Sequence, residues 1–171
     1  AALNVLLYKY SAAEDIVMGS RIACRPHPYL ERLQGKFANT FIFRTRPKPQ
    51  ALFREFLDQV KEISLEVFKH QEYACEGMED YNIIYVYNNM NISKGGQLPG
   101  DLKISPYEFK LGKTLHDLSF HVTEAGDNIW VHILYSRDLF KPETIERMKE
   151  DFLGIFATIC QNPDIPLTEI P

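Results

Sequence analysis

The stretch FANTFIFRTR, residues 37–46, decides how the middle of this chain folds. Apolar and polar residues alternate in it, so Phe37, Phe41 and Phe43 would share one face of a strand with Asn39. Prolines at positions 47 and 49 end the pattern, because proline cannot donate a ladder hydrogen bond. The amide of Asn39 then lies among phenylalanines, where it must find a hydrogen-bonding partner or face a cavity.

Helical patterns lie on both sides of this strand. Between Phe53 and Gln71, apolar residues recur at steps of three and four, with charged residues between them, which predicts an amphipathic helix. A second such stripe follows Pro142 and ends before Asn162. The first residues also have helical spacing, but no capping residue precedes Leu3, which suggests a fragment of a longer chain.

Three further segments have strand patterns. Residues 15–23 predict a strand with a bulge at Gly19, and residues 83–87 predict a central strand covered on both faces. Residues 118–123 and 129–135 predict a hairpin that turns at residues 126–127 and sets His121 opposite His132. Because helices and strands intermix, we expect an α/β layered sandwich, a mixed sheet covered by helices.

Composition excludes several classes of protein. The 171 residues are 45% hydrophobic and 25% charged, as in a soluble globular protein, and we expect a single domain over residues 1–171. No apolar run is long enough to span a membrane, and a net charge of −4 gives no general attraction to nucleic acid or anionic lipid. The three cysteines form no Cys-x-x-Cys pair, which indicates reduced thiols in a cytoplasmic protein.

Basic residues are concentrated in one part of the chain. Residues 21–48 contain seven basic residues and a single acidic one, Glu31. Such asymmetry favours an acidic or phosphate-bearing partner. The alternative is a solvated face whose charge is balanced by the acidic helices.

The residues alone indicate no self-contained catalytic or metal site. His121 and His132 are too few to hold a metal ion, and no third ligand stands at a forced spacing. A nucleophilic thiol at Cys75 would need His70 as a base and a third group to orient that base. The chain also lacks the Gly-x-Ser-x-Gly and phosphate-loop motifs.

Several stretches, in order, resemble the C-terminal half of a condensation domain from nonribosomal peptide synthetases. VLLYKYSAAEDIVMGSRIACRPH (5–27) is similar to the family's Glu-Asp-Ile-Val-x-Gly segment, and GKFANTFIFR (35–44) to its Gly-x-Phe-x-Asn-Thr-x-x-x-Arg motif. HQEYACE (70–76) is similar to His-Gln-Asp/Glu-Tyr-Pro-Phe-Glu. LYSRDLFKPETIERM (134–148) and NPDIPLTEI (162–170) resemble the family's closing hairpin, helix and tail.

The resemblance implies a fold and a reaction. The whole domain would be a V-shaped pair of lobes, each similar to chloramphenicol acetyltransferase, and this chain would be the C-terminal lobe without the N-terminal one. The family joins a donor thioester on one carrier domain to the amine of an aminoacyl group on another. Its His-His-x-x-x-Asp-Gly motif belongs to the N-terminal lobe, and neither adjacent histidines nor Asp-Gly occur here, so we expect no catalytic residue in this chain.

What the resemblance leaves to this chain is a supporting role. Asn39, Thr40, Arg44 and Gln71 match motifs that line the family's substrate channel, and the loop 88–101 matches a segment that floors it. For Asn39 the alternative is a satisfied strand-end amide, for Arg44 a structural ion pair, and for the loop plain disorder. We expect this chain to bind no cofactor itself, and we expect 4'-phosphopantetheine on the partner carrier domains. The expected partners are the N-terminal lobe, the carrier domains and an adjacent adenylation domain.

Two departures from the family pattern leave other functions open. Ala74-Cys75 replaces the family's Pro-Phe, and its next motif, Arg-Asp-x-Ser-Arg-Asn-Pro-Leu, has no counterpart near residues 76–82. The chain is therefore half of a condensation enzyme, or a degenerate, non-catalytic module that only docks carrier domains. The third hypothesis is a small acyltransferase or hydrolase that uses His70 and Cys75.

Overall fold

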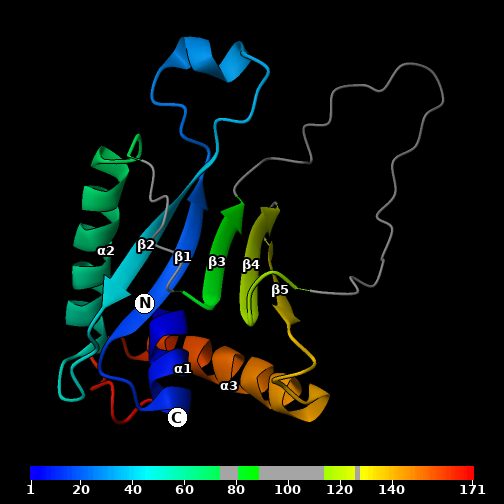
Figure 1. The fold of residues 1–171 in the computed structure, drawn as a ribbon. Coiled ribbons are helices and arrows are strands. Elements are labelled where there is room, and N and C mark those ends of the chain that lie inside the picture. The colour runs from blue at the N-terminus through cyan, green and yellow to red at the C-terminus, as the bar shows by residue number, and fades with distance from the viewer. Residues whose placement is uncertain (74–80, 89–113, 126–127) are drawn as a thin grey trace.

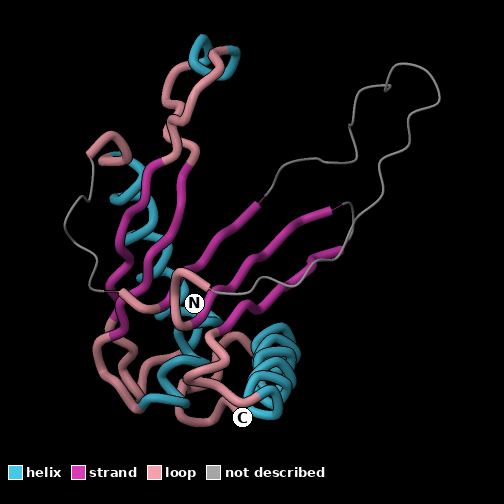
Figure 2. Tube along the Cα trace, turned by 45° about the vertical axis from the view of Figure 1, so that its right-hand side comes forward, coloured by secondary structure: helices cyan, strands magenta, loops and turns pink. Residues whose placement is uncertain are grey.

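The structure is a computed structural model that describes residues 1–73, 81–88, 114–125 and 128–171. Its elements, in chain order (Figure 1), are α1 (Ala2–Ser11), β1 (Ile16–Ile22), the 3-10 helix η1 (Pro28–Arg32), β2 (Asn39–Thr45), α2 (Phe53–Lys69), β3 (Ile83–Asn88), β4 (Leu118–Ala125), β5 (Asn128–Tyr135) and α3 (Pro142–Gln161). The segment between β1 and β2, which carries η1, projects beyond the end of the sheet (Figure 2).

The strands form one mixed sheet in the order β2-β1-β3-β4-β5. β1 pairs with β2 and β4 with β5 in antiparallel fashion, whereas β3 is parallel to both of its neighbours. The predicted fold class, α/β with a mixed sheet covered by helices, is therefore confirmed. Among the described residues, no helix combines the length and the apolar character needed to cross a membrane.

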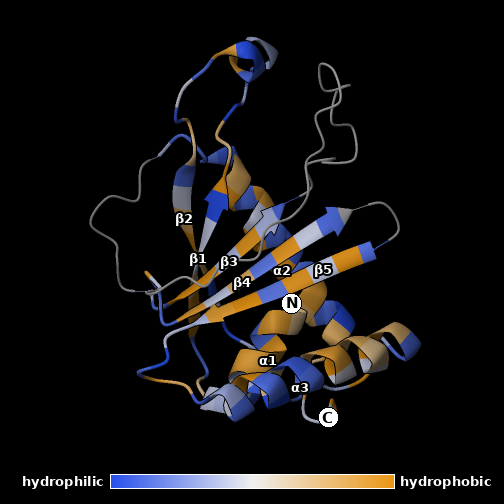
Figure 3. Cartoon of the chain, turned by 90° about the vertical axis from the view of Figure 1, so that its right-hand side faces the viewer, coloured by the Kyte–Doolittle hydropathy of each residue, from blue (hydrophilic) through white to orange (hydrophobic). Residues whose placement is uncertain are grey.

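Helices α1, α2 and α3 lie on the same face of this sheet, which we call the covered face. Side chains from every strand, including Met18 of β1, Tyr85 of β3 and Val131 of β5, meet residues of all three helices around one cavity. Figure 3 shows α1 and α3 together on one side of β3, β4 and β5. The opposite face of the sheet, the open face, has no described helix over it.

The core fills the space between the covered face and the helices. Its large, fully buried side chains include Leu6 of α1, Phe56 of α2, Leu118 and Phe120 of β4, and Ile155 of α3. Full burial of each such side chain contributes about 1.5–3 kcal/mol of transfer free energy. These residues fall on the apolar stripes of the sequence, which is why the predicted helices and strands form where they do.

Most of the predicted strand and helix positions are confirmed. The hairpin pairs Phe120 with Ile133 and His121 with His132, as predicted, while its turn at 126–127 lies outside the described residues. β3 is the central strand, as predicted, and the predicted burial of both of its faces holds only in part: Ile84 on the open face is 3% exposed, whereas Tyr87 on the covered face is 46% exposed. β2 begins at Asn39, so Phe37 lies before the strand and not in it. The guanidinium carbon of Arg25 lies over the Phe37 ring, 4.3 Å from the centroid of that ring.

The prediction of a bulge at Gly19 is wrong, and the structure shows another reason for a glycine at this position. Gly19 pairs in unbroken register with Ile42 on one side and Ile84 on the other. On the open face, a Cβ at this position would come within 2.2 Å of the Tyr81 ring, which itself stacks on His116 with 5.4 Å between centroids. The glycine thus makes room for an aromatic ring from a distant segment.

Replacing Gly19 with alanine is expected to lower the free energy of unfolding by about 1–3 kcal/mol, because Tyr81 must leave its stacked position. Urea unfolding followed by circular dichroism measures this loss. The matched control is Gly154→Ala in α3, where a Cβ meets nothing within 4 Å and the better helix propensity of alanine stabilises by up to about 1 kcal/mol. Equal effects of the two substitutions would contradict the proposed packing of Tyr81.

Candidate functional site

Asn39 ties the start of β2 to the turn that follows α2. Its Nδ2 donates to the carbonyl oxygens of Gln71, at 3.1 Å, and Tyr73, at 2.8 Å. Its Oδ1 accepts from the backbone N–H of Thr40 at 2.9 Å. Cys24, just after β1, donates its thiol to the same Gln71 carbonyl at 3.2 Å. We call this group of Cys24, Asn39, Gln71 and Tyr73 the Asn39 corner.

The hydrogen-bonding capacity of Asn39 is almost filled. An asparagine amide offers two N–H donors and one oxygen with two lone pairs. Both donors reach protein carbonyls and one lone pair is taken, so among the described residues a single lone pair on Oδ1 has no partner. The prediction that this amide needs a partner is confirmed, and its geometry is that of a residue that positions the backbone of residues 71–73.

The structure brings together only part of the predicted channel set. Asn39 and Gln71 meet in the corner, on the side of the sheet that carries α2. Thr40 and Arg44 stand at the alternate positions of β2 and therefore point to the open face. Contact of these four residues with substrate stays a prediction.

Arg44 forms the ion pair that the sequence left open as its alternative role. Its Nη2 lies 2.6 Å from Oδ2 of Asp15 and its Nε lies 2.9 Å from Oδ1, a two-point contact at the start of β1. Arg46 adds a hydrogen bond to the same carboxylate at 3.2 Å. The pair is exposed, with 62% of the Arg44 side chain accessible, so it orients β2 against β1 more than it stabilises the fold.

Because of this ion pair, Asp15 is expected to stay ionised at lower pH than an ordinary aspartate. Hydrogen bonds from Arg44, with those from Arg46, lower the pKa of Asp15 from 3.8 to about 2. Because the folded-state pKa is depressed, the contribution of the pair is complete above pH 3.8 and is lost as the pH falls through about 2. Carboxyl NMR should show the Asp15 pKa rising toward 3.8 in Arg44→Gln and unchanged in Arg54→Gln, whose arginine pairs with Asp164 instead. A low Asp15 pKa in Arg44→Gln would contradict the assignment.

Arg25 belongs to the first family-like stretch, but the sequence did not predict its structural role. Its guanidinium donates to the carbonyl oxygens of Leu30, Leu33 at 3.0 Å and Gly35 at 3.3 Å. It thereby gathers the projecting segment between β1 and β2 around one side chain. The sequence signal for this role is the position of Arg25 at the start of the Arg-Pro-His-Pro loop, near the end of the first family-like stretch.

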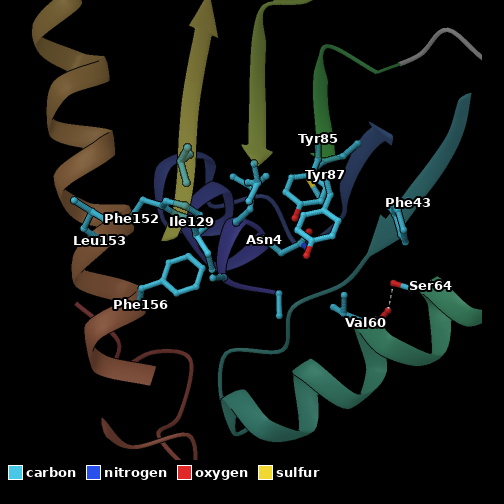
Figure 4. A pocket seen from close by; sticks show the side chains of 16 residues that line it. Asn4, Phe43, Val60, Ser64, Tyr85, Tyr87, Ile129, Phe152, Leu153 and Phe156 are labelled. Carbon is cyan, nitrogen blue, oxygen red and sulfur yellow. Dashed lines mark hydrogen bonds between the residues drawn. The ribbon is translucent and has the colours of Figure 1, made fainter. Parts of the chain in front are cut away.

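A cavity of about 480 Å³ lies on the covered face, between α2 and α3. Figure 4 shows Phe43, Tyr85 and Phe156 around it, with Asn4 at the first turn of α1. Asn4 is buried and its Oδ1 accepts from the Thr45 hydroxyl at 2.6 Å, while Ser64 donates to the carbonyl of Val60. The lining of the cavity is mostly apolar, and it includes none of the predicted channel residues.

The other candidate chemistries gain no partners from the described residues. His121 and His132 do face each other across β4 and β5, but no third metal-binding side chain joins them within the described ranges. Nε2 of His70 lies 3.2 Å from Oε1 of Glu66. Ala74 and Cys75, which replace the family's Pro-Phe, fall outside the described residues. The predicted channel-floor segment also falls outside them from residue 89 onward. The hypothesis of a Cys75–His70 pair stays a prediction.

Comparison with known proteins gives a consistent result. A condensation domain family model matches residues 1–171. Surfactin synthase subunit 2 of Bacillus subtilis is 35% identical over 99% of this chain, and gramicidin S synthase 2 of Brevibacillus brevis is 36% identical over 99% of it. The chain spans only 5% and 4% of these two relatives. Both alignments run over 183 positions against 171 residues in the chain, so the relatives carry inserted residues.

Solved structures share the fold at lower identity. A four-domain nonribosomal peptide synthetase, holo-AB3403, superposes with a TM-score of 0.83 at 19% identity, covering 98% of this chain and 15% of that one. The first condensation domain of the CDA synthetase gives a TM-score of 0.74 at 15% identity, over 99% of this chain and 40% of that one. The X-domain from teicoplanin biosynthesis gives 0.82 at 20% identity, over 99% and 42%.

Proposed function

Because the chain belongs to the condensation domain family, we propose that it is the C-terminal lobe of a condensation domain in a nonribosomal peptide synthetase. The match of the family model over residues 1–171 carries this proposal. The chain covers 40% of a solved condensation domain, which supports its assignment to one lobe. Residues 1–171 would form this lobe as a single unit that packs against an N-terminal lobe.

The proposed reaction is amide formation between two carrier-bound groups. The amine of an aminoacyl thioester attacks the carbonyl carbon of a donor thioester, so a C–N bond forms, the C–S bond breaks and the donor thiol leaves with a proton. The group that accepts the amine proton would be an imidazole of the N-terminal lobe. Both thiols would belong to 4'-phosphopantetheine arms on carrier domains, and an adenylation domain would be adjacent.

This chain would supply a wall of the substrate channel. The Asn39 corner fixes the backbone of residues 71–73 through two hydrogen bonds, and one Oδ1 lone pair remains to accept from an amide of the arm or substrate. A neutral hydrogen bond of this kind contributes about 1 kcal/mol net. Gln71 stands at the same corner, while Thr40 and Arg44 would act from the open face.

The experiment is a condensation assay on the intact domain that contains this chain, with donor- and acceptor-loaded carrier domains. Amide product detected by mass spectrometry supports the proposal. The matched control replaces the acceptor aminoacyl group with its hydroxy acid analogue, which lacks the attacking amine. Absence of amide product from a folded domain with competent carriers would overturn the catalytic proposal.

A non-catalytic docking module is the second candidate. The missing Arg-Asp-x-Ser-Arg-Asn-Pro-Leu motif favours it, and so does the similarity to an X-domain solved in complex with OxyB, because that fold is seen bound to a protein partner. Carrier binding measured in the same samples separates the two. Binding without turnover supports the docking module, and turnover excludes it.

A further inference from the structure

The open face of the sheet carries a row of side chains at one level across all five strands. Arg21 pairs with Thr40 of β2, and the parallel pairing of Ser20 with Tyr85 puts Arg21 at the level of Val86 in β3. Val86 pairs with His121, and His121 pairs with His132 of β5. We call these residues, Thr40, Arg21, Val86, His121 and His132, the open-face row.

All five side chains of the row point away from the helices. Directly paired residues lie on the same face, and each member of the row stands next in sequence to a residue of the covered face, such as Tyr85 and Val122. Arg21 and His132 are exposed, while Thr40, Val86 and His121 are partly buried. The row is therefore accessible from the side that no described helix covers.

The charges along this row have one sign. Arg21 forms no ion pair with any side chain in the described ranges. Burial lowers the pKa of His121, and the positive charges of Arg21 and His132 lower it further. Burial and Arg21 also lower the pKa of nearby His116, which Asp117 partly offsets. The neighbours of His121 on its own strand, Ser119 and Thr123, are uncharged.

The spacing leaves room for an anion between Arg21 and His121. Adjacent strands lie about 4.8 Å apart, so residues two strands apart stand about 10 Å from each other at the backbone. Val86 occupies the strand between them and is a short apolar floor. An oxyanion above Val86 can accept two parallel N–H bonds from the guanidinium of Arg21 and one from the imidazole of His121.

We propose that the open-face row binds a tetrahedral oxyanion of the phosphate class above Val86, held by Arg21 on one side and by His121 with His132 on the other. The anion pairs with the charge of Arg21 and offsets the repulsion that protonation of His121 would otherwise create beside it. The anion can be the phosphodiester of a carrier-bound pantetheine arm or a free phosphate. The proposed site follows from the pairing register of the strands and does not depend on whether the chain takes part in condensation.

The test is histidine NMR on the intact domain, with inorganic sulfate as the probe because its charge stays constant near neutral pH. The ring ε1 protons of His121 and His132 are assigned with His121→Gln and His132→Gln. We expect both signals to shift saturably with sulfate, and the midpoint of the His121 titration to move to higher pH, because the anion favours the imidazolium. Binding should therefore tighten as the pH falls.

Arg21→Gln is expected to weaken sulfate binding about tenfold, as the loss of a charge-assisted contact implies. Arg32→Gln removes the same charge from η1, outside the row, and should leave the affinity unchanged. Sulfate affinity that is the same in Arg21→Gln as in the wild type, or histidine signals that do not respond to sulfate, would overturn the proposal.

A second arm identifies the source of the anion. Pantetheine 4'-phosphate that binds more tightly than inorganic phosphate assigns the site to a carrier arm, and equal affinities assign it to the free ion. Either result supports an oxyanion site. Because binding is measured without carriers or turnover, its failure is distinguishable from a failure of the condensation assay.

Discussion

Replacing Asn39 with alanine is expected to slow amide formation by the intact condensation domain about ten- to a hundredfold. The substitution removes both hydrogen bonds that hold the Gln71 and Tyr73 carbonyl oxygens, at 3.1 and 2.8 Å. The segment that carries Gln71 then loses its fixed position at the proposed channel wall, and a misplacement of about 1 Å in a substrate-positioning group can cost a hundredfold in rate. The measurement is turnover with loaded carriers, normalised to the folded fraction.

A matched control separates positioning from general damage. Asn128→Ala makes the same change at the exposed start of β5, where Asn128 pairs with Ala125, and should leave turnover near that of the wild type. Asn39→Ala should also lower the free energy of unfolding by about 1–2 kcal/mol, since two carbonyls lose their donor. Wild-type turnover in folded Asn39→Ala would show that the corner has no part in the reaction.

Replacing Phe120 with alanine is expected to lower the free energy of unfolding by about 3–5 kcal/mol. Phe120 is fully buried in β4, at 0% exposure, and its ring lies 5.8 Å from that of Phe152 in α3. Its loss removes a large apolar group and leaves a cavity between the sheet and α3, which the surrounding side chains fill only in part. Chemical denaturation measures the change.

Phe156→Ala is the control for this prediction. Phe156 belongs to the same helix as Phe152 and packs against it with ring centroids 4.9 Å apart, but 41% of Phe156 is exposed beside the cavity of the covered face. Its truncation should therefore cost clearly less than that of Phe120. An equal or larger loss in Phe156→Ala would show that the core does not lie where we place it.

How far the sequence predicts the fold depends on how local the signal is. The register of the β4–β5 hairpin is predicted correctly, because a short turn and strict alternation leave one pairing that buries Phe120 with Ile133. The role of Gly19 is not predictable in this way. Its reason is the ring of Tyr81, which comes from a segment more than sixty residues away, so a gap in the strand pattern resembles a bulge.

The candidate site shows the same division. That the Asn39 amide needs a partner follows from its place among phenylalanines, but its partners are backbone carbonyls at Gln71 and Tyr73, thirty-two and thirty-four positions away. The facing of His121 and His132 is predicted from the hairpin alone. Arg21 joins them only through the parallel pairings of β3, and no turn fixes such a register in the sequence.

The central claim is that this chain forms a wall of the channel while another lobe supplies the imidazole that handles the proton. The most direct test measures amide formation by the intact domain in two variants. One replaces the histidines of the His-His-x-x-x-Asp-Gly motif expected in the N-terminal lobe, and the other combines His70→Ala with Cys75→Ala. We expect turnover to be abolished in the first variant and to stay within a few-fold of wild type in the second. Loss of turnover in the second variant with retention in the first would place the chemistry in this chain instead.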